Sequence, residues 1–322
     1  RLTLAFFLVP MLGICQQGQA SRERSQADSN ETLRFEGART EIYKAAGETK
    51  LTIHIFEPDG HKPSDKRPAI VFFFGGGWLK GTPRQFEQHC RYLASRGMVA
   101  MAADYRVFSR HRATVDQCVE DAKSAIRWVR SNAERLGIDP QRIAAGGGSA
   151  GGHIAACAGL VPGFEADGEK ANVSSVPDAM VLFNPAILLG LMKGFTNAFP
   201  ESGREDVKKR LGVAPEKLSP THFVDKGAPP TLVLHGKEDT TVPYWTAEAF
   251  VEAMRKVGNR AELVGYEGQG HSFFNYGRGD NPYFLKTVEE MDKFLVSIGY
   301  LKGPSTAQAY FSRNRNAVNV SP

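Results

Sequence analysis

The sequence is poor in cysteine, with four in 322 residues, and it contains no Cys-x-x-Cys pair and no cysteine–histidine cluster. Such clusters are what a structural zinc ion needs, so the sequence excludes that kind of site. Cys15 lies in an N-terminal segment that we expect to be removed. Three cysteines then remain, and an odd number argues against a disulfide framework.

Neither sign of charge dominates. The chain has 40 Lys and Arg against 35 Asp and Glu, a net charge of +5, and the two signs are interleaved along the sequence. This pattern excludes the basic stripe of a nucleic-acid-binding protein. With 42% hydrophobic and 23% charged residues, the composition also excludes a disordered chain, a fibre and a polytopic membrane protein.

The apolar run near the N-terminus is too short for a membrane span. It follows Arg1 and covers about 14 residues, whereas a bilayer needs roughly 20. Gly18 and Ala20 stand at positions −3 and −1 of a cleavage point. We therefore expect a signal peptide over residues 1–20. The mature chain is then secreted or periplasmic and has no integral membrane span. The alternative is that this segment is a membrane anchor or a buried helix.

The central part of the chain, residues 35–302, alternates apolar β-rich runs with helical stretches. This order predicts an α/β protein with a doubly wound, mostly parallel sheet, preceded by an antiparallel edge hairpin that turns near Gly47. A small helical insertion interrupts the rhythm over about 188–219. Residues 303–322 lack apolar periodicity, and we expect a loose C-terminal tail there. The expected strands are Leu51–Phe56, Ala69–Phe74, Met98–Ala103, Ile143–Gly146, Ala179–Phe183, Thr231–His235 and Ala261–Tyr266, and the expected helices are Gln85–Arg96, Thr114–Leu136, Gly151–Leu160, Tyr244–Val257 and Pro282–Ile298.

Glycine, in contrast, is abundant: 33 residues, more than the average usage of about 7%. Eight of them fall in two clusters, Gly75–Gly77 and Gly146–Gly152. Each cluster directly follows or ends an expected strand. Because ligands of doubly wound sheets lie outside the carboxyl ends of the strands, these clusters mark the expected site.

Two motifs overlap in the second cluster, RIAAGGGSAGGH. The glycines match G-x-G-x-x-G, the dinucleotide fingerprint, but that motif needs a second strand ending in an acidic residue about 20 positions later, and none follows. The segment also matches G-x-S-x-G around Ser149. In a nucleophile elbow such a serine occupies a strained strand-to-helix turn that exposes its hydroxyl. A purely structural turn is the alternative.

A serine nucleophile needs a base, and the base needs an orienting carboxylate. In this type of sheet they follow in the order Ser, Asp, His, each after a later strand. Asp239 follows the strand TLVLH, and His271 follows the strand AELVGY. The order and context together favour a Ser149–His271–Asp239 triad.

The first glycine cluster predicts an oxyanion hole. The strand AIVFFF runs into GGGWLKG, and a glycine run lets backbone N–H groups face a substrate carbonyl. The N–H of Ala150, the residue after the nucleophile, supplies another donor. Neither a metal nor an organic cofactor is needed for this chemistry.

With these motifs the chain resembles the hormone-sensitive-lipase-like esterases of the α/β-hydrolase superfamily, and more closely their acetyl and feruloyl esterase-like branch. The shared motifs, in order, are FGGGW, DYR, GGSAGGH, HGKEDTTVP and GQGHSFF. The resemblance implies Gly76, Gly77 and Ala150 as the amide donors. Two positions depart from the pattern, because Phe74 stands where the family has a histidine and Gly148 where the lipases have an aspartate.

The resemblance implies a serine carboxylesterase that acts on small acyl esters, of acetyl or feruloyl type, with a small-molecule or carbohydrate-linked substrate. The same triad cleaves amides, so a hydrolase like the kynurenine formamidases or the prolyl oligopeptidases stays open. A non-catalytic adhesion module on this fold is the alternative of a different class. Oligomeric state cannot be inferred from the sequence.

Several residues near the motifs have supporting interpretations. Trp78 and Leu79 are candidates for an acyl pocket, with plain packing as the alternative. We expect His153 to be packed rather than catalytic. His235 is expected to brace the Asp239 loop, and Asp104–Arg106 to hold adjacent loops through polar contacts.

Overall fold

The computed structural model describes residues 33–170, 172–190 and 209–318. The expected signal peptide, residues 1–20, and most of the expected insertion, residues 191–208, lie outside the described residues. From Gly37 onward the chain forms one unit, and that unit is described below.

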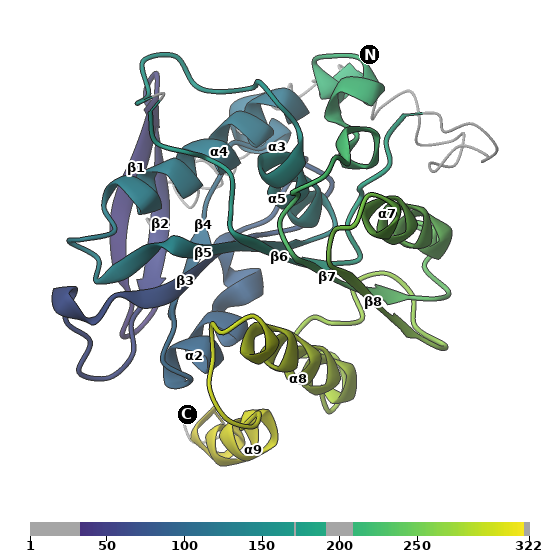
Figure 1. The fold of residues 1–322 in the computed structure, drawn as a ribbon. Coiled ribbons are helices and arrows are strands. Elements are labelled where there is room, and N and C mark those ends of the chain that lie inside the picture. Colours follow the sequence, from purple (N-terminus) through teal and green to yellow (C-terminus); the bar gives the residue numbers. More distant parts are fainter. Residues whose placement is uncertain (1–32, 171, 191–208, 319–322) are drawn as a thin grey trace, which may run out of the picture. The chain divides into compact units, whose positions relative to one another are not determined.

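An eight-stranded sheet runs through this unit in the order β1-β2-β4-β3-β5-β6-β7-β8 (Figure 1). β1 and β2 form an antiparallel hairpin, β2 pairs antiparallel with β4, and the other neighbours are parallel. This confirms the predicted doubly wound, mostly parallel α/β fold with an antiparallel edge. The strands are β1 Arg39–Ala46, β2 Thr49–Phe56, β3 Arg67–Phe73, β4 Val99–Ala103, β5 Ile138–Gly148, β6 Ala179–Phe183, β7 Thr231–Gly236 and β8 Ala261–Tyr266.

Helices cover both faces of the sheet. α4, α5 and α7 lie on one face, and α2 and α8 lie on the other (Figure 1). α4 is shorter than expected because the chain leaves the helix after Ser131 and turns back at Gly137, whose backbone φ is +63°. The helices are α2 Glu87–Ser95, α3 Phe108–His111, α4 Val115–Ser131, α5 Ala150–Leu160, α7 Tyr244–Lys256, α8 Pro282–Ser297 and α9 Ala307–Val318, with 3₁₀ turns η2 Pro63–Asp65, η3 Pro83–Phe86, η4 Pro215–Leu218 and η5 Pro220–Phe223.

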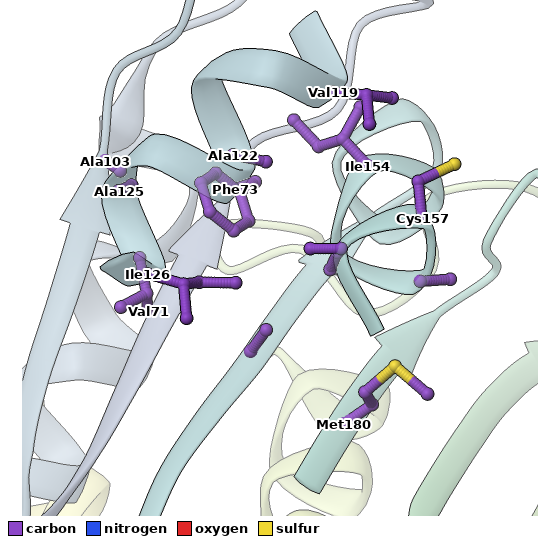
Figure 2. Close-up of a cluster of buried hydrophobic side chains, with 14 of the residues drawn as sticks. Val71, Phe73, Ala103, Val119, Ala122, Ala125, Ile126, Ile154, Cys157 and Met180 are labelled. Carbon is purple, nitrogen blue, oxygen red and sulfur yellow. The ribbon is translucent and has the colours of Figure 1, made fainter. Parts of the chain in front are cut away.

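The core lies where α4 and α5 pack on the central strands. Ala122 and Ala125 of α4 are small enough to let the helix approach Val71 and Phe73 of β3, and Ile154 of α5 points toward the same layer (Figure 2). All five side chains are fully buried. Burying a valine, isoleucine or phenylalanine contributes about 1.5–3 kcal/mol each. This packing fixes the carboxyl ends of β3 and β5, and the site is built from the loops that follow them.

The prediction of a loose tail over 303–322 was wrong, because α9 forms within it. Ala307 and Phe311 are buried. The ring of Phe311 lies 4.9 Å from that of Phe284 in α8 and 5.7 Å from that of Tyr92 in α2. The helix is therefore held by tertiary aromatic contacts, which a reading of local periodicity does not register.

Candidate active site

Ser149 occupies a one-residue turn between β5 and α5. Its backbone, with φ 54° and ψ −118°, lies in a region that costs a non-glycine residue about 1–3 kcal/mol. Three hydrogen bonds hold it there. The Ser149 N–H donates to the Phe183 carbonyl at 2.9 Å, and the Ser149 carbonyl accepts from the N–H groups of His153 at 2.9 Å and Ala186 at 3.4 Å. The strain is thus maintained by β6 on one side and the first turn of α5 on the other.

The glycines around Ser149 are required by close backbone approach. A Cβ at Gly151 would lie 2.0 Å from the carbonyl oxygen of Phe73, and a Cβ at Gly147 would lie 2.5 Å from the backbone of Gly151. Both distances are too short for any side chain. The G-x-S-x-G spacing therefore reflects how tightly α5 must approach β3 and β5 to raise Ser149 above the sheet.

The structure brings Ser149, His271 and Asp239 together from the loops that follow β5, β8 and β7. His271 Nε2 lies 2.9 Å from Ser149 Oγ, and His271 Nδ1 lies 2.7 Å from Asp239 Oδ2. A carboxylate only accepts hydrogen bonds, so Nδ1 carries the proton in the neutral imidazole. Nε2 is then free to accept the hydroxyl proton of Ser149. The three residues form one continuous hydrogen-bonded chain, in the predicted order.

Asp239 is buried and remains ionised because donors surround it. Burial raises the pKa of its carboxyl group, but the hydrogen bonds from His235, His271 and the Val242 N–H outweigh burial and bring the pKa well below its usual range. Oδ1 accepts from the N–H groups of Thr241 and Val242, each at 2.9 Å. The carboxylate is therefore fixed in orientation and charged at the pH of ordinary assays.

His235 braces the Asp239 loop, as expected. Its Nε2 donates to the Val242 carbonyl at 2.8 Å and lies 3.2 Å from Asp239 Oδ2. The ring is completely buried at the end of β7. His235 thus holds both the backbone of this loop, at Val242, and the carboxylate of Asp239.

Five carbonyl groups of the loop after β3 accept hydrogen bonds. Four of them accept from other segments, and the Gly76 carbonyl accepts from within the loop. The Phe74 carbonyl accepts from Tyr105 Oη (2.7 Å), the Gly76 carbonyl from the N–H groups of Leu79 and Lys80 (3.1 and 3.2 Å), the Gly77 carbonyl from Arg210 Nη1 (2.5 Å), the Trp78 carbonyl from the Phe108 N–H (3.0 Å) and the Leu79 carbonyl from the Ser109 N–H (2.9 Å). These bonds fix the orientation of the loop's peptide groups.

Among the described residues, the same loop also presents backbone N–H groups without acceptors. Within the described part of the chain, the amides of Gly76, Gly77 and Ala150 donate no hydrogen bond, whereas the Gly75 N–H donates to Gln85 Oε1 at 2.6 Å. The loop passes next to the serine, because a Cβ at Gly75 would lie 3.3 Å from Ser149 Cβ. Free amides beside the nucleophile's hydroxyl are what an oxyanion site requires.

The comparison with solved structures places this geometry among esterases. The structure described as Thermogutta terrifontis esterase 2 phosphonylated by sarin matches with a TM-score of 0.82 and 50% identity, over 85% of this chain and 99% of that one. The family model described as BD-FAE matches residues 53–254. The chain belongs to the BD-FAE family of α/β-hydrolase esterases. A second model, described as the dienelactone hydrolase family, matches residues 200–317.

Curated relatives of this esterase are longer proteins. Esterase LipC of Mycobacterium tuberculosis is 35% identical over 66% of this chain and 54% of its own length. Isoprenylcysteine alpha-carbonyl methylesterase ICME of Arabidopsis thaliana is 33% identical over 64% of this chain and 50% of its own. The chain spans about half the length of these relatives. The Thermogutta terrifontis esterase has also been solved with propionate bound, at 51% identity and a TM-score of 0.78 over 84% of this chain and 100% of that one.

Trp78 and His153 of this esterase pack against each other. Trp78 is 4% exposed, and its Nε1 donates to His153 Nδ1 at 3.2 Å. His153 Nε2 donates to the Leu218 carbonyl at 2.7 Å, and burial lowers the pKa of His153 to about 4. The prediction that His153 is packed is confirmed. Leu79, by contrast, is 39% exposed.

Phe74 fills the place of the family histidine by stacking. Its ring centroid lies 4.1 Å from that of Tyr105. The DYR segment makes the expected polar contacts: Asp104 pairs with Arg110 at 2.7 Å, and Arg106 pairs with Asp121 at 2.8 Å. The sequence patterns did not indicate Gln85 or Arg210, because neither lies in a recognised motif.

Neither a metal-binding group nor a membrane-spanning helix is found in the parts of the chain that the structure describes. No cluster of three or more histidine, cysteine, aspartate or glutamate side chains in residues 33–170, 172–190 and 209–318 is arranged to hold a metal ion. Over the same residues, no helix is both long and apolar enough to cross a membrane.

Proposed function

We propose that this esterase hydrolyses carboxylic esters with Ser149 as nucleophile, His271 as base and Asp239 as the group that orients the base. The observation that carries the proposal is the continuous chain of hydrogen bonds from Ser149 Oγ to Asp239 Oδ2. In the first step His271 Nε2 takes the hydroxyl proton as Ser149 Oγ attacks the ester carbonyl. The buried, ionised Asp239 stabilises the imidazolium that forms.

The oxyanion of the tetrahedral intermediate is then received by the amides of Gly76, Gly77 and Ala150. Losing one such donor typically costs about 10²–10³ in rate. His271 returns the proton to the alcohol oxygen as the bond between that oxygen and the acyl carbon breaks. The alcohol departs, and the acyl group remains bound to Ser149 Oγ in an acyl-enzyme. Water attacks this acyl-enzyme with the same histidine as base, and the free acid leaves.

The proposed substrates are esters of short acyl chains. The Thermogutta terrifontis esterase, at about half sequence identity, binds propionate in one structure and butyrate in another. Within this class we favour acetyl or feruloyl groups on small molecules or polysaccharides, on the strength of the motif resemblance alone. Leu79 is the candidate wall of the acyl pocket, because it is exposed and follows the free amides.

A substrate panel tests the proposal. Purified protein is assayed on p-nitrophenyl esters of rising chain length, acetylated xylan, methyl ferulate and N-formylkynurenine, with Ser149→Ala as the control. We expect hydrolysis of esters with two to four acyl carbons, falling steeply for longer chains, and no turnover by the control. Faster turnover of the formamide than of any ester would favour the amide-hydrolase alternative. No turnover of any substrate would favour the adhesion module.

We also propose that the mature protein is exported. The pattern of Arg1, an apolar run and small residues at Gly18 and Ala20 supports this. Expression of the full chain in a bacterial host, followed by N-terminal sequencing of the secreted or periplasmic product, tests it. A mature N-terminus at Ser21 is expected. An uncleaved product that stays in the cytoplasm would contradict the proposal.

A further inference from the structure

One side chain connects two of the loops that build the site, those after β3 and β8. Gln85, in η3, accepts a hydrogen bond from the Gly75 N–H through Oε1 at 2.6 Å and donates from Nε2 to Asn275 Oδ1 at 2.8 Å. The backbone N–H can only donate, so it fixes which end of the Gln85 amide faces the loop. The other end must then donate, and Asn275 must present its oxygen. The orientation of both amides follows from that one backbone group.

The two loops are far apart in the sheet. Gly75 follows β3 and Asn275 lies in the loop after β8, and β5, β6 and β7 stand between these strands. The sheet therefore does not hold the loops directly against each other. Asn275 is four residues after His271, and its N–H donates to the Ser272 carbonyl at 3.2 Å. A displacement of Asn275 is thus transmitted to the turn that carries the histidine.

Gln85 also determines which amides remain free. Because the Gly75 N–H donates to Gln85, it is not available to an oxyanion, whereas the next two amides, of Gly76 and Gly77, are. Phe74, which stands just before them, has a side chain that cannot hydrogen-bond and stacks on Tyr105 instead. Hydrogen bonding to the start of the glycine run therefore comes from Gln85.

We propose that Gln85, with Asn275, is a positioning residue that holds the oxyanion amides and His271 in register with Ser149. The inference rests on the proposed function of this site. A displacement of about 1 Å in a catalytic group can cost roughly 100-fold in rate. Loss of the bridge should therefore lower kcat much more than it changes KM, because the amides act on the transition state rather than on the bound ester.

The test compares Gln85→Met, which keeps the shape but removes both hydrogen bonds, with Gln85→Glu, which keeps an acceptor for the Gly75 N–H. Gln88→Met, one helical turn along and with no side-chain hydrogen bond among the described residues, is the matched control. With p-nitrophenyl propionate we expect kcat to fall about 10–100-fold in Gln85→Met. In Gln85→Glu the Asn275 amide can rotate and donate, so kcat should stay within roughly 10-fold of wild type. Gln88→Met should match wild type.

A transition-state analogue separates positioning from plain stability. The inhibition constant of a trifluoromethyl ketone, which forms an oxyanion on the serine, should rise in Gln85→Met by the same factor as kcat/KM falls. Asn275→Leu, which leaves the Gly75 bond intact, should give a smaller loss, and its effect should be non-additive with that of Gln85→Met. If Gln85→Met does not fold, Asn275→Leu still tests the inference.

Several results would overturn the inference. The inference fails, while the proposed function stands, if Gln85→Met and Asn275→Leu both keep the kcat of Gln88→Met. It also fails if inhibitor binding is unchanged while kcat and the unfolding temperature fall together. Absence of ester hydrolysis by the wild-type protein, or full activity of Ser149→Ala, would instead overturn the proposed function and this inference with it.

Discussion

The contact between α5 and β3 makes a sharp prediction for Gly151→Ala. The new Cβ would lie 2.0 Å from the Phe73 carbonyl oxygen and 2.4 Å from that of Phe74. Ordinary contacts begin near 3.4 Å, so the helix must move by roughly 1.4 Å, because backbone atoms cannot rotate away. Overpacking of this kind costs about 1–3 kcal/mol, and we expect the upper end. Each kcal/mol lowers Tm by about 2–4 °C in a domain of this size class, which gives a fall of roughly 6–12 °C.

Activity should fall further than stability explains, because Ser149 lies two residues from the substitution. A nucleophile shifted by about 1 Å can lose roughly 100-fold in rate. Gly159→Ala, in the same helix, is the matched control: its Cβ would meet the flexible end of Met180 at 2.6 Å instead of backbone. Better helix propensity, about 1 kcal/mol, should offset that contact. Thermal unfolding and hydrolysis of p-nitrophenyl propionate measure both effects. Equal Tm and activity in the two variants would refute the close-approach argument.

Three further changes probe the groups around the site. Asp239→Asn places an amide N–H₂ against His271 Nδ1 and favours the wrong tautomer, so kcat/KM should fall by about 10³–10⁴; a loss below tenfold would contradict the orienting role. His235→Phe removes the donor to the Val242 carbonyl and Asp239, and kcat should fall by about tenfold or more with a lower Tm; unchanged kinetics would show that the brace is dispensable. His89, buried within five aromatic rings, has its pKa lowered by burial from 6.5 to about 3, so below pH 6.5 the unfolded chain binds a proton that the folded chain does not. The free energy of unfolding should therefore decrease as the pH is lowered from 6.5 to 3, by up to about 1.4 kcal/mol per pH unit. Urea unfolding at pH 7 and pH 4.5 measures this loss, which should be smaller in His89→Leu than in the wild type. Equal losses in the two proteins would contradict the assignment of the pH dependence to His89.

The alternation of strands and helices along the chain and the candidate site could be predicted because both depend on local signals. Buried parallel strands appear as continuous apolar runs, and residues just after such strands meet at one edge of the sheet. Ser149 and Asp239 each follow a buried strand, and His271 follows the partly exposed edge strand β8. Their proximity was therefore expected from their place after parallel strands, without knowledge of any tertiary contact. The glycine spacing around Ser149 likewise records a backbone approach that only glycine permits.

The features that the sequence did not indicate depend on contacts between distant segments. The Gln85 bridge joins residues 190 positions apart, and nothing in the local sequence distinguishes Gln85 from Gln88. α9 was missed for a related reason. Among its side chains that the structure describes, the apolar buried positions are Ala307 and Phe311, too few to give a clear period, and the helix packs on rings of α2 and α8. A weak signal was present, because these two positions are four residues apart.

Covalent labelling tests the central claim most directly. A fluorophosphonate reacts with a serine only where a base activates its hydroxyl, so the purified protein is incubated with one and the adduct is located by peptide mass spectrometry. We expect one adduct, on Ser149, together with loss of ester hydrolysis, and neither labelling nor hydrolysis in Ser149→Ala. An adduct on another residue with Ser149 unmodified, or undiminished hydrolysis in Ser149→Ala, would contradict the account.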